Sequence, residues 1–402
     1  MAKKGLRDID VRGRRVLVRV DFNVPLEPSG GRVLDDSRIR ASLPTIRYLQ
    51  EQGARIVLCS HLGRPRGRDP ALSLAPVARR LSELLGRPVP IAPCCIGAEV
   101  EAMVAALGPG DVMLLENVRF HPEEEENDPA YARALSRLAD VFVNDAFAAA
   151  HRAHASTAGV AAHLPAVAGL LMEQEIANLS RALAPERPYA AVIGGAKVST
   201  KMGVLRNLLG RADRLLLGGG MANTFLKAEG FDVGASLVED EYLEEARRIM
   251  EEARQRGVRL LLPSDVVVAD RLAADAQSRR VSVKEVPPGW QIVDIGDTTL
   301  EVFAHALADC RTVVWNGPMG VMELEPFARG SRRLAGAIAG LRGAVTIVGG
   351  GETAAVVEAL GLTDRFTHVS TGGGATLEFL EGKELPGIAA LQDAGTRAGG
   401  DP

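Results

Sequence analysis

Glycines and cationic side chains are distributed unequally along this chain of 402 residues. Three glycine triplets lie in the second half, at 218–220, 349–351 and 372–374, whereas five of the seven histidines lie in the first half. Glycine beside a helix start lets backbone N–H groups approach the phosphates of a nucleotide, and arginine and histidine in loops suit a small, multiply charged anion. A protein with one site of each kind is a candidate for moving a phosphoryl group between them.

Four arginines of the first half lie close to predicted strand ends or loops: Arg38, Arg64, Arg119 and Arg152. A guanidinium offers a fixed fork of donors for phosphate or carboxylate, so two or three that converge would hold a doubly charged ligand. For any single arginine, a solvated surface position is the better interpretation. As a set beside His61 and Asn23, they form the candidate anion site of the first half.

A glycine pair and two lysines share one predicted strand-to-helix turn in the second half, the segment GGAKVSTK (194–201). Lys197 and Lys201 are four residues apart, which predicts that both lie on one helix face near the positive end of the helix. The spacing G-x-x-x-x-G-K-[ST] occurs nowhere in the chain, so this is not a Walker A loop. The alternative is a glycine turn followed by two surface lysines.

Each glycine triplet follows a predicted strand and leads into a helix-like segment. The three sets are Gly218, Gly219 and Gly220; Gly349, Gly350 and Gly351; and Gly372, Gly373 and Gly374. One such turn commonly serves chain reversal or close packing, but three before helix starts fit a nucleotide better. Glu352 follows the second triplet, where it can hold Mg²⁺ or cap a helix, and Glu323 is placed to accept hydrogen bonds from a ribose.

Short runs rich in valine, isoleucine and leucine alternate with segments of helical period. Strands are predicted at 15–20, 55–59, 111–115, 141–143, 190–193, 214–217, 312–315 and 344–348, and helices at 38–50, 77–85 and 129–138. This alternation predicts an α/β protein with βαβ units and parallel sheets. A length of 402 residues predicts two domains, and the proline-punctuated helical stretch 169–188 is the best boundary.

Charge and composition argue against several classes of protein. The 47 Lys and Arg nearly balance the 51 Asp and Glu, which is not typical of a nucleic-acid or membrane-surface protein. No apolar run approaches 18 residues, and no apolar stretch follows the N-terminal lysines, so no membrane span or targeting segment is predicted. The four cysteines form no CxxC pair and are interpreted as reduced thiols of a cytosolic protein.

Nine segments of the chain resemble phosphoglycerate kinase, in the expected order. They are RVDFNVPL (19–26), SHLGRPRG (60–67), LLENVRFHPEEEEND (114–128), VNDAFAAAHRAHAST (143–157), GGAKVSTK (194–201), LLGGGMANTFLKAEG (216–230), VVWNGPMGVME (313–323), IVGGGETAA (347–355) and STGGGATLEFLEGKELPGIAAL (370–391). The resemblance implies two doubly wound, Rossmann-like domains facing across a cleft, joined by an interdomain helix. It also implies a reversible, Mg²⁺-dependent transfer from 1,3-bisphosphoglycerate to ADP, giving 3-phosphoglycerate and ATP in glycolysis.

Domain bounds also follow from the resemblance. We expect an N-terminal 3-phosphoglycerate-binding domain at 1–170, an interdomain helix and hinge at 171–186, and a C-terminal nucleotide-binding domain at 187–376. Residues 377–402 are expected to return to the N-terminal domain. The implied protein is a cytoplasmic monomer that closes about its hinge and binds neither nucleic acid nor membrane.

The resemblance implies a role for each residue that matches a family motif. Asp21 and Asn23 would meet the glycerate hydroxyl and carboxyl region, and the stable 3-phosphate would be held by His61, Arg64, Arg119 and Arg152. Arg38 would approach the transferring group from the substrate side and Lys197 from the nucleotide side, with Gly373 and Gly374 completing the catalytic set. Lys201 would contact nucleotide phosphates, Gly218, Gly219 and Gly220 would flank adenine, and Glu323 would bind ribose. The implied nucleotide site is completed by Asn316, Gly349, Gly350, Gly351, Glu352 and Thr353.

Three positions depart from the family pattern. Glu352 stands where Asp is usual, so the carboxylate that would ligate Mg²⁺ reaches about one methylene further. Ala148 replaces a usual Gly, and Thr376 replaces a usual Ser. Two other functions would require different features. A nicotinamide-dependent oxidoreductase would need a G-x-G-x-x-G fingerprint, which is missing, and a catalytically silent scaffold would have lost the cationic residues.

Overall fold

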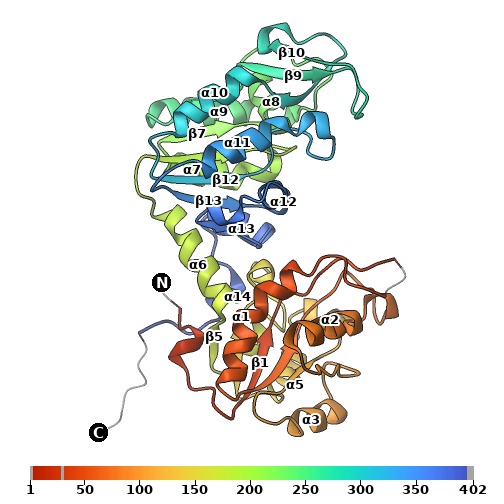
Figure 1. Ribbon diagram of the computed structural model, residues 1–402. Coiled ribbons are helices and arrows are strands. Elements are labelled where there is room, and N and C mark those ends of the chain that lie inside the picture. The colour runs from red at the N-terminus through yellow and green to blue at the C-terminus, as the bar shows by residue number, and fades with distance from the viewer. Residues whose placement is uncertain (1–2, 29–30, 396–402) are drawn as a thin grey trace. The chain divides into compact units, whose positions relative to one another are not determined.

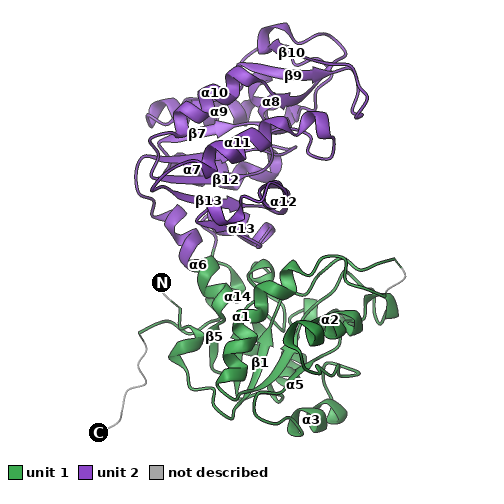
Figure 2. Cartoon of the chain, in the orientation of Figure 1, with its two compact units in different colours: residues 1–176, 384–402 green, residues 177–383 purple. Residues whose placement is uncertain are grey.

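The structure is a computed structural model that describes residues 3–28 and 31–395. Its described residues form two compact units, which divide the chain between Ile176 and Ala177 and again between Lys383 and Glu384 (Figure 2). Each unit has its own parallel sheet and its own cluster of buried apolar side chains. The fold is therefore α/β, as the sequence predicted.

Unit 1 comprises the chain before the first division and the chain after the second. It is built on a parallel sheet of five strands in the order β3-β2-β1-β4-β5 (Figure 1). The strands are β1 (Arg15–Arg19), β2 (Arg55–Cys59), β3 (Val112–Leu114), β4 (Val141–Asn144) and β5 (Ala166–Ala168). The helices are α1 (Ser37–Glu51), α2 (Ala75–Leu85), α3 (Ala98–Ala105), α4 (Pro122–Glu125), α5 (Pro129–Ser136) and α14 (Pro386–Ala389).

Unit 2 contains a parallel sheet of six strands in the order β14-β13-β12-β6-β7-β8 and an antiparallel sheet in the order β10-β9-β11 (Figure 1). The strands are β6 (Tyr189–Ile193), β7 (Arg214–Leu217), β8 (Arg259–Leu261), β9 (Asp265–Ala269), β10 (Ser278–Ser282), β11 (Gln291–Ile295), β12 (Thr312–Asn316), β13 (Val345–Gly349) and β14 (His368–Val369). The helices are α7 (Met202–Leu209), α8 (Gly219–Ala228), α9 (Leu243–Gln255), α10 (Asp297–Leu307), α11 (Arg329–Ala339), α12 (Gly351–Ala359) and α13 (Gly374–Leu380).

Local chemistry explains where several elements begin and end. The Asp128 carboxylate accepts a hydrogen bond from the Tyr131 N–H at 2.8 Å and so caps α5. Gly86 ends α2 in the left-handed conformation, with φ of 66°. All eight predicted strands and all three predicted helices are confirmed, with ends that differ by no more than two residues.

The chain crosses between the units in helix α6 (Leu170–Leu183) and returns after α13. The Asp145 carboxylate accepts a hydrogen bond from the Leu171 N–H at 2.9 Å, which anchors the start of α6 to the end of β4. Residues 377–383 lie in unit 2, although the sequence placed them in the returning segment, because α13 extends to Leu380 and packs against α7. The domain bounds expected from the sequence stay a prediction.

After the second division, the chain is fixed to unit 1 by backbone hydrogen bonds. The Gly387 N–H donates to the Ala150 carbonyl at 2.8 Å, and the Lys4 N–H donates to the Gln392 carbonyl at 2.8 Å. Among the described residues, no helix combines the length and apolar character needed to cross a membrane.

Candidate active site

Unit 1 gathers polar side chains at the carboxyl ends of its parallel strands. Asp21 and Asn23 follow β1, and His61 follows β2. The Asn23 Oδ1 accepts a hydrogen bond from the Gly63 N–H at 2.9 Å, which ties the two loops together. Arg38, in the first turn of α1, forms an ion pair with the Asp21 carboxylate. Four of the predicted substrate-binding residues are therefore held at one end of the sheet.

His61 lies in a positively charged cluster. Its pKa is well below the ordinary value, first because the ring is buried and then because of the charges of Arg19, Arg119, Arg152 and Arg38. The imidazole is therefore neutral at pH 7. Its Nδ1 lies 3.1 Å from the Arg19 Nη2, which can only donate, so the proton is on Nε2, where it can serve an anion.

The four predicted arginines differ in their placement. Arg119 is buried, and its Nη1 donates to a backbone carbonyl at 2.7 Å. Arg38 and Arg152 are half-buried, whereas Arg64 is exposed. Of these four, Arg119, Arg152 and Arg38 are among the charges that lower the pKa of His61, after the larger effect of Arg19, whereas Arg64 is not. Arg38, Arg119 and Arg152 are thus the predicted arginines whose charges reach His61.

Arg19 belongs to this cluster but was missed from the sequence. Its side chain is only 1% exposed, and its Nε donates to the Ser156 Oγ at 2.8 Å. The Ser156 hydroxyl donates in turn to the buried Glu124 carboxylate at 2.6 Å. The available signal was an arginine within the otherwise apolar run 16–20, because a charge on a buried strand needs partners.

Three glycine-containing loops of unit 2, after β6, β7 and β12, pack backbone against backbone. The Gly195 N–H donates to the Pro318 carbonyl at 2.9 Å, and the Gly219 N–H donates to the Met319 carbonyl at 3.1 Å. A Cβ on Gly219 would lie 2.7 Å from the Pro318 oxygen and from the Gly195 nitrogen. Close loop packing is therefore one reason for glycine in the triplet 218–220.

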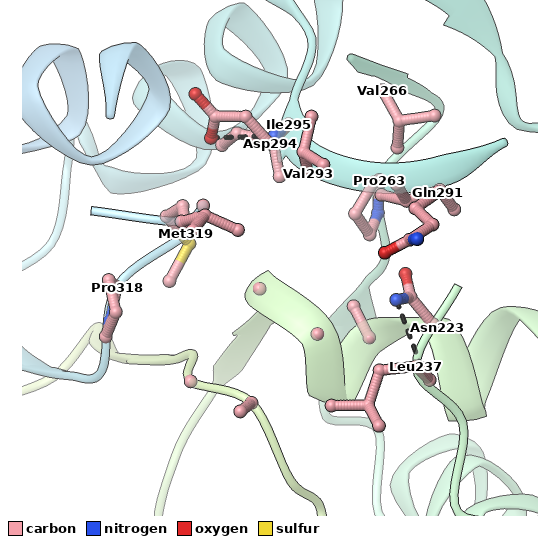
Figure 3. Close-up of a pocket in the computed structure, with 18 of the residues that line it drawn as sticks. Asn223, Leu237, Pro263, Val266, Gln291, Val293, Asp294, Ile295, Pro318 and Met319 are labelled. Atoms are coloured by element: carbon pink, nitrogen blue, oxygen red, sulfur yellow. Dashed lines mark hydrogen bonds between the residues drawn. The ribbon is translucent and has the colours of Figure 1, made fainter. Parts of the chain in front are cut away.

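The same loops form part of the wall of a cavity of about 250 Å³ within unit 2 (Figure 3). Apolar side chains such as Leu237, Pro263 and Val266 line much of it. A cavity of this kind suits a flat heterocycle. The predicted nucleotide-binding residues that line it are Gly219, Gly220, Glu323 and Glu352.

Lys201 and Asn316 are paired in the interior of unit 2. The Lys201 ammonium donates to the Asn316 Oδ1 at the end of β12. Burial lowers the pKa of Lys201 to about 8, and the negative charge of Glu352 opposes this shift. Within the described part of the chain, the buried Asn316 Nδ2 has no hydrogen-bond partner. The pair thus presents donors suited to an anion.

The second glycine triplet joins β13 to α12. Gly349 ends the strand, and Gly350 has φ of 92°, which favours glycine. The buried Thr353 Oγ1 accepts a 2.7 Å hydrogen bond from the backbone of the loop after β12. Glu352 is exposed in the first turn of α12. Thr353 therefore ties two loops together, whereas Glu352 is accessible to a ligand.

One expectation about the lysines is wrong. Lys197 and Lys201 do not share a helix face, because a 3₁₀ turn at Ser199–Lys201 precedes α7, which begins at Met202. Lys197 is exposed, whereas Lys201 is buried. The four-residue spacing predicted a continuous helix that the chain does not form here. The two lysines therefore differ in accessibility and in pKa.

The third triplet precedes the seven-residue helix α13. Gly373 has φ of 52°, and Gly374 is the first residue of the helix. The Gly372 N–H donates to the Ser370 Oγ at 3.1 Å, and that hydroxyl lies 2.6 Å from the Thr376 Oγ1. These bonds fix the turn in which the predicted catalytic glycines lie.

Comparison with known proteins gives the family. A family model described as phosphoglycerate kinase matches residues 6–383. The phosphoglycerate kinases of Moorella thermoacetica and Pelotomaculum thermopropionicum are 58% and 59% identical to this chain over 395 residues, and each alignment covers 98% of this chain and 100% of the relative. The chain belongs to the phosphoglycerate kinase family. It is thus a phosphotransferase that moves a phosphoryl group between 1,3-bisphosphoglycerate and ADP in glycolysis.

Solved structures of phosphoglycerate kinases share the fold. The enzyme of Coxiella burnetii matches with a TM-score of 0.88 and 46% identity, covering 97% of this chain and 98% of that chain. The enzyme of Pyrococcus horikoshii matches with a TM-score of 0.85 and 36% identity, covering 96% and 98%. Two Rossmann-like domains are therefore confirmed, and the nicotinamide-dependent alternative receives no support.

Proposed function

We propose that this phosphoglycerate kinase carries its substrate site on unit 1 and its nucleotide site on unit 2. The observation that carries the proposal is that the charges of Arg38, Arg119 and Arg152 act together on a neutral, buried His61. Three cations around one donor suit a compact, multiply charged anion such as 3-phosphoglycerate. Unit 2 offers the complement, an apolar cavity together with the Lys201 and Asn316 donors.

In the proposed substrate site, the His61 Nε2–H and the guanidinium groups of Arg119 and Arg152 hold the stable 3-phosphate. Arg64 is exposed and joins them only if its side chain turns toward the ligand. Asp21 and Asn23 orient the glycerate end. The ion pair with Asp21 restrains Arg38 beside this position, from which its guanidinium stabilises the transferring phosphoryl group.

In the proposed nucleotide site, adenine occupies the apolar cavity beside 218–220, and Glu323 binds the ribose. The phosphates extend toward Lys201 and Asn316. The turn 349–351 and the backbone at Gly373 and Gly374 complete this phosphate site. Thr353 supports this site by holding the loop after β12. Lys197, exposed and cationic, acts on the transferring group from the nucleotide side.

Mg²⁺ fits the proposed site as a nucleotide-bound ion. Among the described residues, no group of three or more His, Cys, Asp or Glu side chains is placed to hold a metal. Mg²⁺ commonly binds through one or two carboxylates, substrate phosphates and water, so a single accessible carboxylate is sufficient. Glu352, on the cavity wall, would supply it. When bound, the ion would neutralise phosphate charge.

Transfer in this scheme is direct and in line, with no covalent enzyme intermediate. Phosphoryl transfer needs positioning and stabilisation of the equatorial oxygens more than it needs a nucleophilic side chain. Arg38 and Lys197 belong to different units, so the units must approach each other during the reaction, which would also exclude water. A cytoplasmic monomer that binds neither nucleic acid nor membrane remains part of the proposal, supported by the charge balance and by the family.

A coupled assay with 3-phosphoglycerate and MgATP tests the scheme. We expect Arg38→Ala and Lys197→Ala each to lower kcat about a hundredfold or more, a loss of roughly 3 kcal/mol of transition-state stabilisation. Arg47→Ala, at an exposed position of the same helix α1, and Lys284→Ala, exposed in unit 2, are the matched controls and should keep parental activity. An Arg38→Ala or Lys197→Ala enzyme as active as the parent would overturn the scheme.

A further inference from the structure

One polar atom in the cavity of unit 2 lacks a partner. Asn223 lies on α8, lines the cavity and is only 1% exposed. Its Nδ2 donates to the Leu237 carbonyl at 3.2 Å, but its Oδ1 has no hydrogen-bond partner in the part of the chain that the structure describes. A buried acceptor without a donor is costly, so this oxygen is suited to a ligand that brings one.

The orientation of the Asn223 carboxamide follows from its surroundings. The Leu237 carbonyl can only accept, so the Asn223 NH₂ group must face it and the Oδ1 must face away. Figure 3 shows the oxygen of Asn223 directed toward Gln291 on β11. A flipped amide would place two oxygens against each other. Asn223 therefore presents an acceptor, and not a donor, to the cavity.

The rest of the cavity indicates the kind of group that meets this acceptor. Leu237, Pro263 and Val266 lie around the two carboxamides and offer apolar contact to a flat ring (Figure 3). Gln291 also lines the cavity, and its carboxamide can either donate or accept. The fixed element at this end of the cavity is thus the Asn223 oxygen.

We propose that the Asn223 Oδ1 accepts a hydrogen bond from the exocyclic amino group at position 6 of the purine, and that the chain thereby prefers a 6-aminopurine nucleotide. This inference rests on the nucleotide site proposed above. A 6-oxopurine places an acceptor opposite the Asn223 oxygen, so two acceptors would face each other without a proton between them. A purine with hydrogen at position 6 leaves the Asn223 oxygen buried and unpaired.

Calorimetric titration of the full chain with three nucleotides tests this assignment. ADP carries the 6-amino group, inosine diphosphate carries a 6-oxo group, and purine riboside 5′-diphosphate carries hydrogen. We expect the parent to bind ADP about tenfold more tightly than the hydrogen analogue, and the 6-oxo nucleotide more weakly still. This series needs no substitution, so it remains decisive if a variant folds poorly.

Asn223→Leu keeps a similar side-chain shape but removes the acceptor. We expect it to bind ADP about tenfold more weakly than the parent and to bind the three nucleotides within about twofold of one another. Gln291→Leu is the matched control on the same cavity and should keep the preference for ADP. Equal binding of ADP and the hydrogen analogue by the parent, or an unchanged preference in Asn223→Leu, would overturn the role of Asn223 but not the proposed nucleotide site. Failure of the parent to bind any of the three would overturn the nucleotide site itself.

Discussion

Two of the buried basic side chains of the candidate site, His61 and Lys201, illustrate how burial sets charge. His61 is neutral because its environment is both buried and positive. Lys201 is buried with no directly bonded carboxylate among the described residues, and its pKa falls to about 8. A lysine near that pKa is still an ammonium at pH 7 but loses its charge at mildly alkaline pH.

Nucleotide binding should therefore depend on pH through Lys201. Below pH 8 the ammonium is present and attracts phosphate, whereas above pH 8 the side chain of the free enzyme must take up a proton before it binds. We expect the affinity for ADP to fall by a factor approaching tenfold for each pH unit above about 8, which titration between pH 6.5 and 9.5 would measure. Lys201→Arg, which stays charged, should abolish the dependence; a persistent dependence would assign it to another group.

Glu352 has a separate prediction, because it is the carboxylate proposed to meet Mg²⁺. Glu352→Ala should raise the Mg²⁺ concentration for half-maximal activity by about tenfold, since one of the few protein ligands is lost. Glu352→Asp, the usual residue of the family, should restore it. An alanine variant with the parental Mg²⁺ dependence would show that the nucleotide alone holds the ion.

Much of the candidate site was predictable at the residue scale. Asp21, Asn23 and His61 follow predicted strands, and ligands of parallel sheets lie at those ends. Arg19 was not found, since its partners Ser156 and Glu124 are far from it in sequence. Asn223 was not found either, because the carbonyl that orients it belongs to a loop whose path only the fold determines.

At the scale of elements, the loops after β6 and β12 are held at backbone contact distance. Gly317 has φ of 96°, and a Cβ there would lie 2.2 Å from the Gly194 oxygen. Gly361 also has positive φ, at 64°, but a Cβ there would meet open space. A substitution at Gly361 therefore meets backbone strain alone, whereas one at Gly317 meets both backbone strain and a close contact.

Substituting these glycines should destabilise the fold to different extents. Gly361→Ala should lower the free energy of unfolding by about 1 kcal/mol, the cost of a left-handed alanine. Gly317→Ala adds a backbone clash and should cost at least about 3 kcal/mol. Urea denaturation measures both, and equal losses would show that the loops relax without cost.

The start of α6 predicts a pH-dependent stability. Burial raises the pKa of Asp145 to about 7, so the unfolded carboxyl ionises at lower pH than the folded one. Its contribution is present below about pH 4 and is lost as the pH rises to about 7, by up to about 4 kcal/mol. Asp145→Asn can still accept from the Leu171 N–H and should remove this dependence of the free energy of unfolding on pH, as measured by urea denaturation. A parent whose free energy of unfolding does not fall over this pH range would contradict the assignment.

Elements with strong apolar patterns were predicted well, and the antiparallel sheet of unit 2 was not. In β10 the sequence SRRVS is largely exposed, so it lacks the apolar alternation that marks a strand. The helix expected around Lys197 failed for a different reason, since the 3₁₀ turn before α7 has no signal in residue spacing. Helical period alone does not locate the first residue of a helix.

At the scale of the whole molecule, the residues proposed for the two substrates belong to different compact units. The sequence indicated this division through the stretch 169–188 but not its position within α6, because the helix continues without a break across it. Residues 377–383, which the sequence placed in the returning segment, belong to unit 2 by their contacts, since the packing of α13 on α7 joins residues distant in sequence.

This division predicts that the two binding steps can be impaired separately. Lys201→Met should weaken ADP binding at least about tenfold and leave 3-phosphoglycerate binding within about twofold of the parent, because a charged contact to phosphate is lost in unit 2 alone. Arg119→Ala should do the reverse. Equilibrium titration with each ligand measures both, and a variant that weakens both ligands equally would contradict separate half-sites.

The central claim is that the phosphoryl group passes directly between the two substrates, with cations from both units and no phosphorylated side chain. The most direct measurement is the stereochemical course of transfer from ATP made chiral at the γ-phosphorus with oxygen isotopes. A single in-line displacement predicts inversion of configuration at phosphorus. Retention would require two displacements through a phosphoenzyme and would contradict the account.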